Sequence, residues 1–193
     1  LNLQRGDLEI TNSYNGSGTE NNPYAAGVYL ASRAWSGGKP TVTMAMSGGS
    51  ITAKRTAGGH GYGICCAGSG NSASSIDLTG GTITAEVPNG TYALGVYVSG
   101  HSSISNMTIN ASSSTNPYAI FTGASDAKVV ISSGTYSSVS TGANPRALLT
   151  RGNVSVLVGT FTTSGTTGAY GLYVSNGTAV INAGSFSATA TAG

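Results

Sequence analysis

Charged residues are scarce in this chain. Its 193 residues include 8 Lys plus Arg and 6 Asp plus Glu, so that 7% are charged, against roughly 25% in typical soluble domains. A net charge of +2 without a basic run provides no electrostatic footprint for nucleic acid or for an anionic membrane. No apolar run approaches the roughly 18 residues of a membrane span. We therefore expect no nucleic-acid partner and no membrane insertion.

Cysteine is scarce as well. Cys65 and Cys66 are the only two cysteines, and because they are adjacent their side chains point to opposite faces of a strand. A bond between them would be strained, and the usual disulfide scaffold is excluded. We interpret them as two small apolar residues, with a vicinal disulfide or a redox role as the alternative.

Strong helix formers are few, whereas glycine is abundant. The chain has 30 Gly in 193 residues, about 15.5%, which is double the usual share of about 7%. Gly, Ser, Thr and Asn are poor helix formers, and Leu, Glu and Lys are scarce. Hydrophobic residues make up 39% of the chain and only 5 residues are Pro, a composition that argues against disorder. We therefore expect an ordered chain with almost no helix.

A motif of glycine, a hydroxyl residue and an apolar residue recurs along the chain. Its hydroxyl members lie at positions 50, 82, 108, 135, 160 and 185, with spacings of 32, 26, 27, 25 and 25 residues. A second register places aliphatic residues at 28, 64, 96, 120, 148 and 172. Between the two registers lies a third short apolar stretch, of which Val154-Ser155-Val156 is an example. The spacing predicts repeats of about 25 residues with three short strands each.

Repeats of this size cannot bury a face alone, but stacking them creates a continuous core. Helical solenoids need amphipathic helices, leucine-rich repeats need their leucine pattern, and propeller blades need four strands, none of which the sequence offers. The predicted fold class is therefore all-β, a parallel β-helix (β-solenoid) of about 6–7 coils of roughly 25 residues. Variable spacing in the first half predicts loops near 31–40, 54–60 and 86–92.

Three segments carry a resemblance to a known group of proteins. Gly80-Gly81-Thr82-Ile83-Thr84, Gly159-Thr160-Phe161 and Tyr170-Gly171-Leu172-Tyr173-Val174 resemble the right-handed β-helix repeats of large secreted or cell-surface bacterial proteins, including adhesin-like ones. The resemblance spans about residues 24 to 187. It implies a right-handed coil, an extracellular location and a bacterial source. Because Leu1 is preceded by no Met or basic leader, we expect one β-solenoid domain over 1–193 that is a segment of a longer protein.

The first register predicts a polar ladder on one face. Alternation sends an apolar column to the core and its hydroxyl neighbours outward. The outward residues include Thr82, Thr84, Thr135, Ser137, Thr160, Thr162, Ser185 and Ser187, with Asn110 as a departure. This ladder resembles the Thr-x-Thr faces of solenoid antifreeze proteins, which implies an ice-binding alternative. Thr is also simply a good residue for an exposed strand.

The second register predicts an outward aromatic stripe. Tyr29, Tyr97, Phe121 and Tyr173 each follow an inward aliphatic residue, and each has a Gly or Ala two positions earlier that is predicted on the same outer face. Flat rings beside small residues offer platforms for sugar rings or for a partner surface. Mutual stacking between coils is the structural alternative. A further aromatic set, predicted to cap a corner, consists of Tyr24, Tyr62, Tyr92, Tyr118 and Tyr170, with Arg146 in one coil beside Arg151 as a solvated basic spot.

The sequence shows no strong catalytic constellation. Glycan-cleaving enzymes need clustered carboxylates, whereas the acids Asp7, Glu9, Glu20, Asp77, Glu86 and Asp126 fall at unmatched positions. Neither His60 nor His101 has a partner at a metal-site spacing, and no phosphate-binding loop is present. We therefore expect no catalytic residue, metal or cofactor. Asp126 and Lys128 near the two arginines form the best cluster for the alternative, a polysaccharide lyase or hydrolase.

These expectations converge on a non-catalytic, extracellular, structural or adhesin-like module. Its predicted ligand is a carbohydrate or a host cell-surface molecule, bound by Tyr29, Tyr97, Phe121 and Tyr173. Neither the identity of the ligand nor the oligomeric state follows from the sequence.

Overall fold

The computed structural model describes residues 1–12, 25–32, 42–68 and 74–192. All regular elements in these residues are β-strands, and every strand pair is parallel. None of the described segments is a helix of the length and apolarity that crossing a bilayer needs. The predicted all-β class with parallel pairing is confirmed, and the arrangement is compatible with a solenoid.

The larger of two sheets has twelve strands in two limbs that share strands β4 (Thr43–Arg55) and β6 (Ser75–Val87). The first limb contains the C-terminal halves of these strands together with β2 (Asp7–Asn12), β9 (Met107–Ser113), β12 (Gly134–Ser140), β15 (Thr160–Gly165) and β18 (Ser185–Ala190). The second limb contains their N-terminal halves together with β1 (Asn2–Leu3), β8 (His101–Ile104), β11 (Lys128–Ile131), β14 (Asn153–Val156) and β17 (Ala179–Ile181). The register shifts between Met46 and Ser50, where β4 passes from one limb to the other.

The smaller sheet has six strands. In spatial order these are β3 (Ala25–Ser32), β5 (His60–Gly68), β7 (Tyr92–Val98), β10 (Asn116–Thr122), β13 (Arg146–Thr150) and β16 (Tyr170–Val174). From β8 to β16 the chain visits the second limb, the first limb and the six-stranded sheet in that order three times. The three short strands predicted for each repeat therefore fall into three separate ladders.

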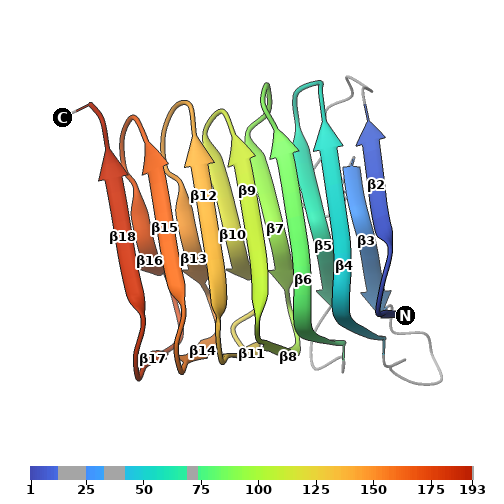
Figure 1. The fold of residues 1–193 in the computed structure, drawn as a ribbon. Coiled ribbons are helices and arrows are strands. Elements are labelled where there is room, and N and C mark those ends of the chain that lie inside the picture. The colour runs from blue at the N-terminus through green and yellow to red at the C-terminus, as the bar shows by residue number, and fades with distance from the viewer. Residues whose placement is uncertain (13–24, 33–41, 69–73, 193) are drawn as a thin grey trace.

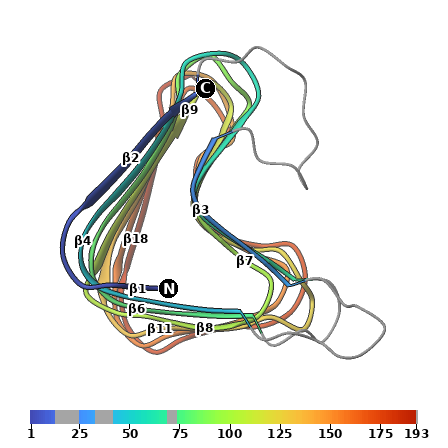
Figure 2. The same cartoon turned by 90° about the vertical axis from the view of Figure 1, so that its right-hand side faces the viewer.

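The strands stack side by side from the N-terminus at one end to the C-terminus at the other (Figure 1). Seen along this stack, the two limbs and the six-stranded sheet form three sides around an interior (Figure 2). The two limbs bow outward, whereas the six-stranded sheet bends toward the interior, so that its outer side is concave. Short turns at 56–59 and 88–91 match the predicted loops near 54–60 and 86–92. Of the predicted loop near 31–40, the first two residues belong to β3 and residues 33–40 lie outside the described part of the chain.

Strand pairing places similar residues next to one another on adjacent strands. Thr135 pairs with Thr160, and Phe161 pairs with Phe186, both at a distance of 25 residues along the chain. Adjacent strands of a sheet lie about 4.8 Å apart. Each position of the repeat therefore becomes a column of similar side chains.

The predicted core columns face the interior. Ile51, Ile83, Ile109, Tyr136 and Phe161 are fully buried in one cluster, called here the main core, against which Phe186 packs. The rings of Phe161 and Phe186 are stacked with centroids 4.5 Å apart. The Tyr136 hydroxyl donates to the Ser133 carbonyl over 2.6 Å, and burial raises the pKa of this phenol. The inward direction of Val28, Ile64, Val96, Ile120 and Leu148 is confirmed as well, because all five lie in the main core.

The small residues of the second register correct a prediction. Alternation places Gly63, Gly95 and Ala119 on the outer face, but all three point into the main core. A Cβ atom on Gly63 would lie 2.3 Å from Ile83 Cγ2, and one on Gly95 would lie 2.4 Å from Ile109 Cγ2. Ala119 is itself a fully buried member of the main core. These strands of the six-stranded sheet thus turn two consecutive residues toward the interior, for example Gly63 and Ile64. We call this feature the inward step.

The inward step interrupts the ladder and needs hydrogen bonds of its own. The pairs Ala26 with Tyr62 and Val28 with Ile64 are in register, while the glycines between them are not paired. Farther along the stack, the buried Ser138 hydroxyl accepts from the Ala119 N–H at 2.9 Å and donates to the Arg146 carbonyl at 2.7 Å. The first limb thereby satisfies backbone groups of the six-stranded sheet, as buried backbone groups require.

The two cysteines lie on opposite faces, as predicted. Both are free and buried: Cys66 belongs to the main core, and Cys65 belongs to a second cluster on the outer face of the six-stranded sheet. Burial, with a smaller contribution from the neighbouring Cys66, raises the pKa of Cys65 to about 12. Burial also raises the pKa of Cys66 to about 11. Both thiols therefore pack as small apolar groups.

Replacing Gly95 by Ala tests the inward step. The new methyl group would lie 2.6 Å from the Ala119 carbonyl oxygen as well as against Ile109, and we expect a loss of about 1–3 kcal/mol in the free energy of unfolding. Gly58→Ala is the matched control, because the atom nearest to its Cβ would be 3.6 Å away. Urea denaturation measures both variants, and equal stabilities would contradict the inward step.

The cysteine pKa values predict a dependence of stability on pH. Because burial raises both pKa values above the ordinary 9.0, the thiols of the unfolded chain ionise first. Stability is therefore complete below pH 9 and decreases as the pH rises toward 11. Between pH 8 and 10 the wild type should lose about 3 kcal/mol more than a Cys65→Ala/Cys66→Ala variant in urea unfolding. Parallel losses in the two proteins would refute this origin.

Candidate functional site

The outer side of the six-stranded sheet carries two columns of mostly aromatic residues, and we call it the aromatic face. The first column contains, in spatial order, Tyr29, Cys65, Tyr97, Phe121, Leu149 and Tyr173. The second contains Ala26, Tyr62, Leu94, Tyr118, Arg146 and Tyr170. The four predicted ligand-binding residues thus lie in one column, one to a strand, and the structure brings a second column beside them.

The four predicted residues differ in exposure. Tyr29 is 45% exposed and Tyr173 is 36% exposed, whereas Phe121 is only 7% exposed, and Tyr97 is half-buried. Phe121 packs with Tyr62, Cys65, Leu94, Tyr118 and Leu149 in the second cluster. The stripe therefore points away from the main core, as predicted, but its middle is a packed floor with exposed rings toward both ends.

The rings of the floor meet edge to face. The centroids of Tyr97 and Phe121 are 5.2 Å apart, those of Tyr118 and Phe121 are 5.7 Å apart, and those of Tyr62 and Tyr97 are 6.3 Å apart. All three pairs have nearly perpendicular planes, the arrangement that aromatic quadrupoles favour. The inward step explains the contact between columns, because it places Tyr118 and Phe121, three residues apart, on the same face of β10. Mutual stacking, the structural alternative for these rings, is thus present.

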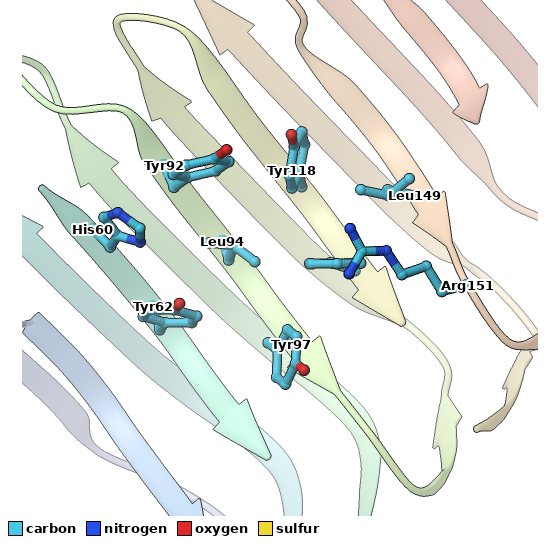
Figure 3. A pocket seen from close by; sticks show the side chains of 9 residues that line it. His60, Tyr62, Tyr92, Leu94, Tyr97, Tyr118, Leu149 and Arg151 are labelled. Atoms are coloured by element: carbon cyan, nitrogen blue, oxygen red, sulfur yellow. The ribbon is translucent and has the colours of Figure 1, made fainter. Parts of the chain in front are cut away.

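A shallow pocket opens over this floor. Nine residues from β5, β7, β10 and β13 and the turn after β13 line it, namely His60, Tyr62, Tyr92, Leu94, Tyr97, Tyr118, Phe121, Leu149 and Arg151. Figure 3 shows the labelled side chains projecting from neighbouring strands toward the same side. The pocket volume is about 80 Å³, which is far below the roughly 300–1,000 Å³ of sites that enclose a small molecule. Its shape suits contact with one side of an extended ligand.

The sequence-based alignment of the second aromatic set was wrong at one position. Tyr92 was grouped with Tyr62 and Tyr118, but the residue in register with both is Leu94. Tyr92 instead pairs with His60, and their ring centroids are 4.8 Å apart. Counting back from the aliphatic member Val96 reveals this shift. Tyr62, Tyr92 and Tyr118 form part of the pocket wall instead of a corner cap, and Tyr170 lies beside Arg146 in the second column. The remaining member, Tyr24, lies outside the described residues.

Two arginines supply the positive charge of the aromatic face. The Arg146 guanidinium carbon lies 4.5 Å from the Tyr173 ring centroid and 5.2 Å from that of Tyr118. Its Nη1 donates to the Tyr118 hydroxyl over 2.7 Å. The Arg151 guanidinium carbon lies 5.3 Å from the Phe121 centroid. Sequence reasoning noted both residues as a solvated basic spot, whereas the structure places them against the rings.

The hydroxyl ladder lies on the outer side of the first limb. Thr135, Thr160, Ser185 and Ser187 are exposed, and Thr82, Thr84, Ser137 and Thr162 are half-buried. Strand pairing aligns them rung by rung through β6, β9, β12, β15 and β18. Asn110 interrupts one rung, and an ion pair of 3.3 Å between Lys54 and Glu86 occupies the neighbouring column.

The candidate carboxylates lie at separate places. Asp77 is on the second limb and accepts from the Ser103 hydroxyl, while Glu86 pairs with Lys54 on the first limb. Asp126 lies in the turn between β10 and β11 and makes no ion pair with another described residue. Over the described ranges, no three His, Cys, Asp or Glu side chains gather to hold a metal ion. None of the described residues in the pocket wall carries a carboxylate.

Comparisons of the chain with protein-family models, with curated proteins and with solved structures found no match.

Proposed function

We propose that this chain winds as a right-handed parallel β-helix of about 6–7 coils and serves as a non-catalytic binding module of a secreted or cell-surface bacterial protein. Support for the coil comes from the in-register pairing of residues about 25 positions apart and from the repeated order of the three ladders. A coil of this kind makes a stiff rod that displays columns of similar side chains. The proposed role is to present those columns to a ligand.

The ligand that the aromatic face suits best is a polysaccharide. The single observation that supports this is the convergence of half-exposed and exposed rings, Tyr97, Tyr170 and Tyr173 among them, around a floor of buried ones. Sugar rings present flat apolar faces with polar edges, and aromatic rings with a free face complement them. An aromatic patch left open on a protein surface is a typical mark of a binding site.

The concave shape and small volume favour a chain over a single sugar. A pocket of about 80 Å³ cannot enclose a monosaccharide, but exposed rings extend on both sides of it, from Tyr29 on β3 to Tyr173 on β16. These two strands are the edges of the six-stranded sheet. Five strand intervals of about 4.8 Å separate them, so the rings span roughly 24 Å.

Ice binding by the hydroxyl ladder is a second candidate, favoured by the alignment of the rungs. Hydroxyl residues two positions apart in a strand are about 7 Å apart, and those in successive rungs are about 4.8 Å apart. The pairing keeps this two-dimensional array in register from β6 to β18. Asn110 interrupts this array, and Lys54 and Glu86 border it. The hydroxyl ladder is therefore less regular than the aromatic face.

A Tyr97→Ala/Tyr173→Ala variant tests the polysaccharide proposal. Removing a stacking ring should weaken binding by about two- to tenfold for each tyrosine on a glycan array, followed by titration of the best glycan. Val139→Ala is the control, because Val139 is 46% exposed on the first limb. Unchanged affinity in a double variant with wild-type melting behaviour would end the proposal.

Thermal hysteresis measurements test the second candidate. If the ladder binds ice, the wild type depresses the freezing point below the melting point, and Thr135→Lys/Thr160→Lys abolishes the effect because two long charged side chains break the array. Val180→Lys, at a site 51% exposed on the second limb, should leave it unchanged. Absence of hysteresis in the wild type removes this candidate without affecting the first.

A further inference from the structure

Two guanidinium groups flank the aromatic floor. Tyr118 and Phe121 are neighbouring rings of β10, with centroids 5.7 Å apart. Arg146 lies 5.2 Å from the first ring and Arg151 lies 5.3 Å from the second. Each of these two neighbouring rings therefore has a guanidinium group beside it. Arg146 is the first residue of strand β13 (Arg146–Thr150), and Arg151 lies in the turn that follows this strand.

Neither arginine forms an ion pair with a described carboxylate. The ion pair found between described residues joins Lys54 and Glu86, on the first limb. None of the nine residues around the pocket is acidic. Arg146 Nη1 donates to a phenol, and its buried Nε has no hydrogen-bond acceptor within the described ranges. A buried N–H without an acceptor is rare in folded proteins. The site therefore has a hydrogen-bond donor, the Arg146 Nε–H, for which the described residues supply no acceptor.

We propose that the ligand of the aromatic face is an acidic polysaccharide, and that Arg146 and Arg151 bind the carboxylates of its uronate units. This inference rests on the proposed function and specifies its ligand. A guanidinium presents its donors in a planar fork that matches both oxygens of a carboxylate. A uronate combines that group with an apolar ring face, so one unit engages an arginine and an adjacent aromatic ring together.

The placement of the two arginines favours a polymer with repeated charge. They are five residues apart, and a fully extended strand would separate their Cα atoms by at most about 17 Å. The apolar floor lies between them, with Phe121 and Leu149 as its buried members. A chain of uronates that crosses the strands passes over this floor between the two arginines and offers carboxylates to both, whereas a lone anion occupies only one of them.

A single-stranded nucleic acid also combines rings with anions, but it suits this surface less well. Nucleic-acid sites gather many Lys and Arg residues along the backbone path. This chain has 8 Lys plus Arg in total, and of the described residues Arg151 alone brings a cation to the pocket wall. Lys128 is exposed on the second limb, a different side of the stack.

Polygalacturonate and its fully methyl-esterified form are the matched probes, because they share one backbone and differ in charge. We expect the wild-type chain to bind polygalacturonate at least about tenfold more tightly than the ester in isothermal titration calorimetry. Arg146→Gln/Arg151→Gln should remove this preference, so that the two probes bind this variant with equal affinity. Lys128→Gln should retain the preference. Melting curves confirm that each variant is folded, and Arg146→Lys provides a variant that retains the charge if Arg146→Gln unfolds.

The outcomes separate this inference from the proposed function. If both probes bind equally, or if Lys128→Gln weakens binding as much as the arginine variants do, the inference is wrong while polysaccharide binding stands. If neither these probes nor any neutral glycan binds, the proposed function fails as well. Tighter binding of oligo(dT) than of polygalacturonate would replace the acidic polysaccharide with a nucleic acid and overturn the inference.

Discussion

Parallel, in-register pairing of successive repeats is the constraint on which the rest of this molecule depends. Each residue pairs with its counterpart about 25 positions away. Every column must therefore accommodate similar side chains on strands about 4.8 Å apart. Isoleucines and stacked phenylalanines meet this condition, and so do threonines. Like charges do not, since two unit charges at this distance repel by about 1 kcal/mol even in water. The scarcity of charge is therefore a consequence of the stacking.

Two of the charged sites in the described part of the chain illustrate the same rule. Lys54 and Glu86 are direct neighbours in one column and have opposite signs. Arg146 lies between Tyr118 and Tyr170, with rings instead of cations on both sides. A guanidinium over an aromatic ring is attracted by the electron-rich face of the ring. The stacking thus accommodates Arg146 at a place where its neighbours in the column are rings that stabilise it.

The inward step connects the fold to the candidate site. By turning Ala119 and Ile120 inward together, it leaves Tyr118 and Phe121 on the same outer side, where alternation alone would have separated them. An irregularity that disrupts the ladder in this way bends a strand, and the six-stranded sheet does bend toward the interior (Figure 2). A concave sheet brings the two aromatic columns closer together. The small residues that the core demands, Gly63 and Gly95 among them, are therefore also what creates the binding surface.

Spacing and alternation in the sequence were enough to predict parallel strands, three ladders, the core columns and the outward hydroxyl rungs, because these features repeat locally with a period of two residues within a repeat. The direction of Gly63 and Ala119, the burial of Phe121 and the alignment of Leu94 with Tyr118 were decided by tertiary contacts. When a strand turns two consecutive residues inward, the inward–outward alternation of its side chains is broken. The contacts of Ile83 and Ile109 with the glycines show where this occurs, and the sequence alone does not. The position of Arg146 and Arg151 against the rings likewise depends on which columns the bend brings together.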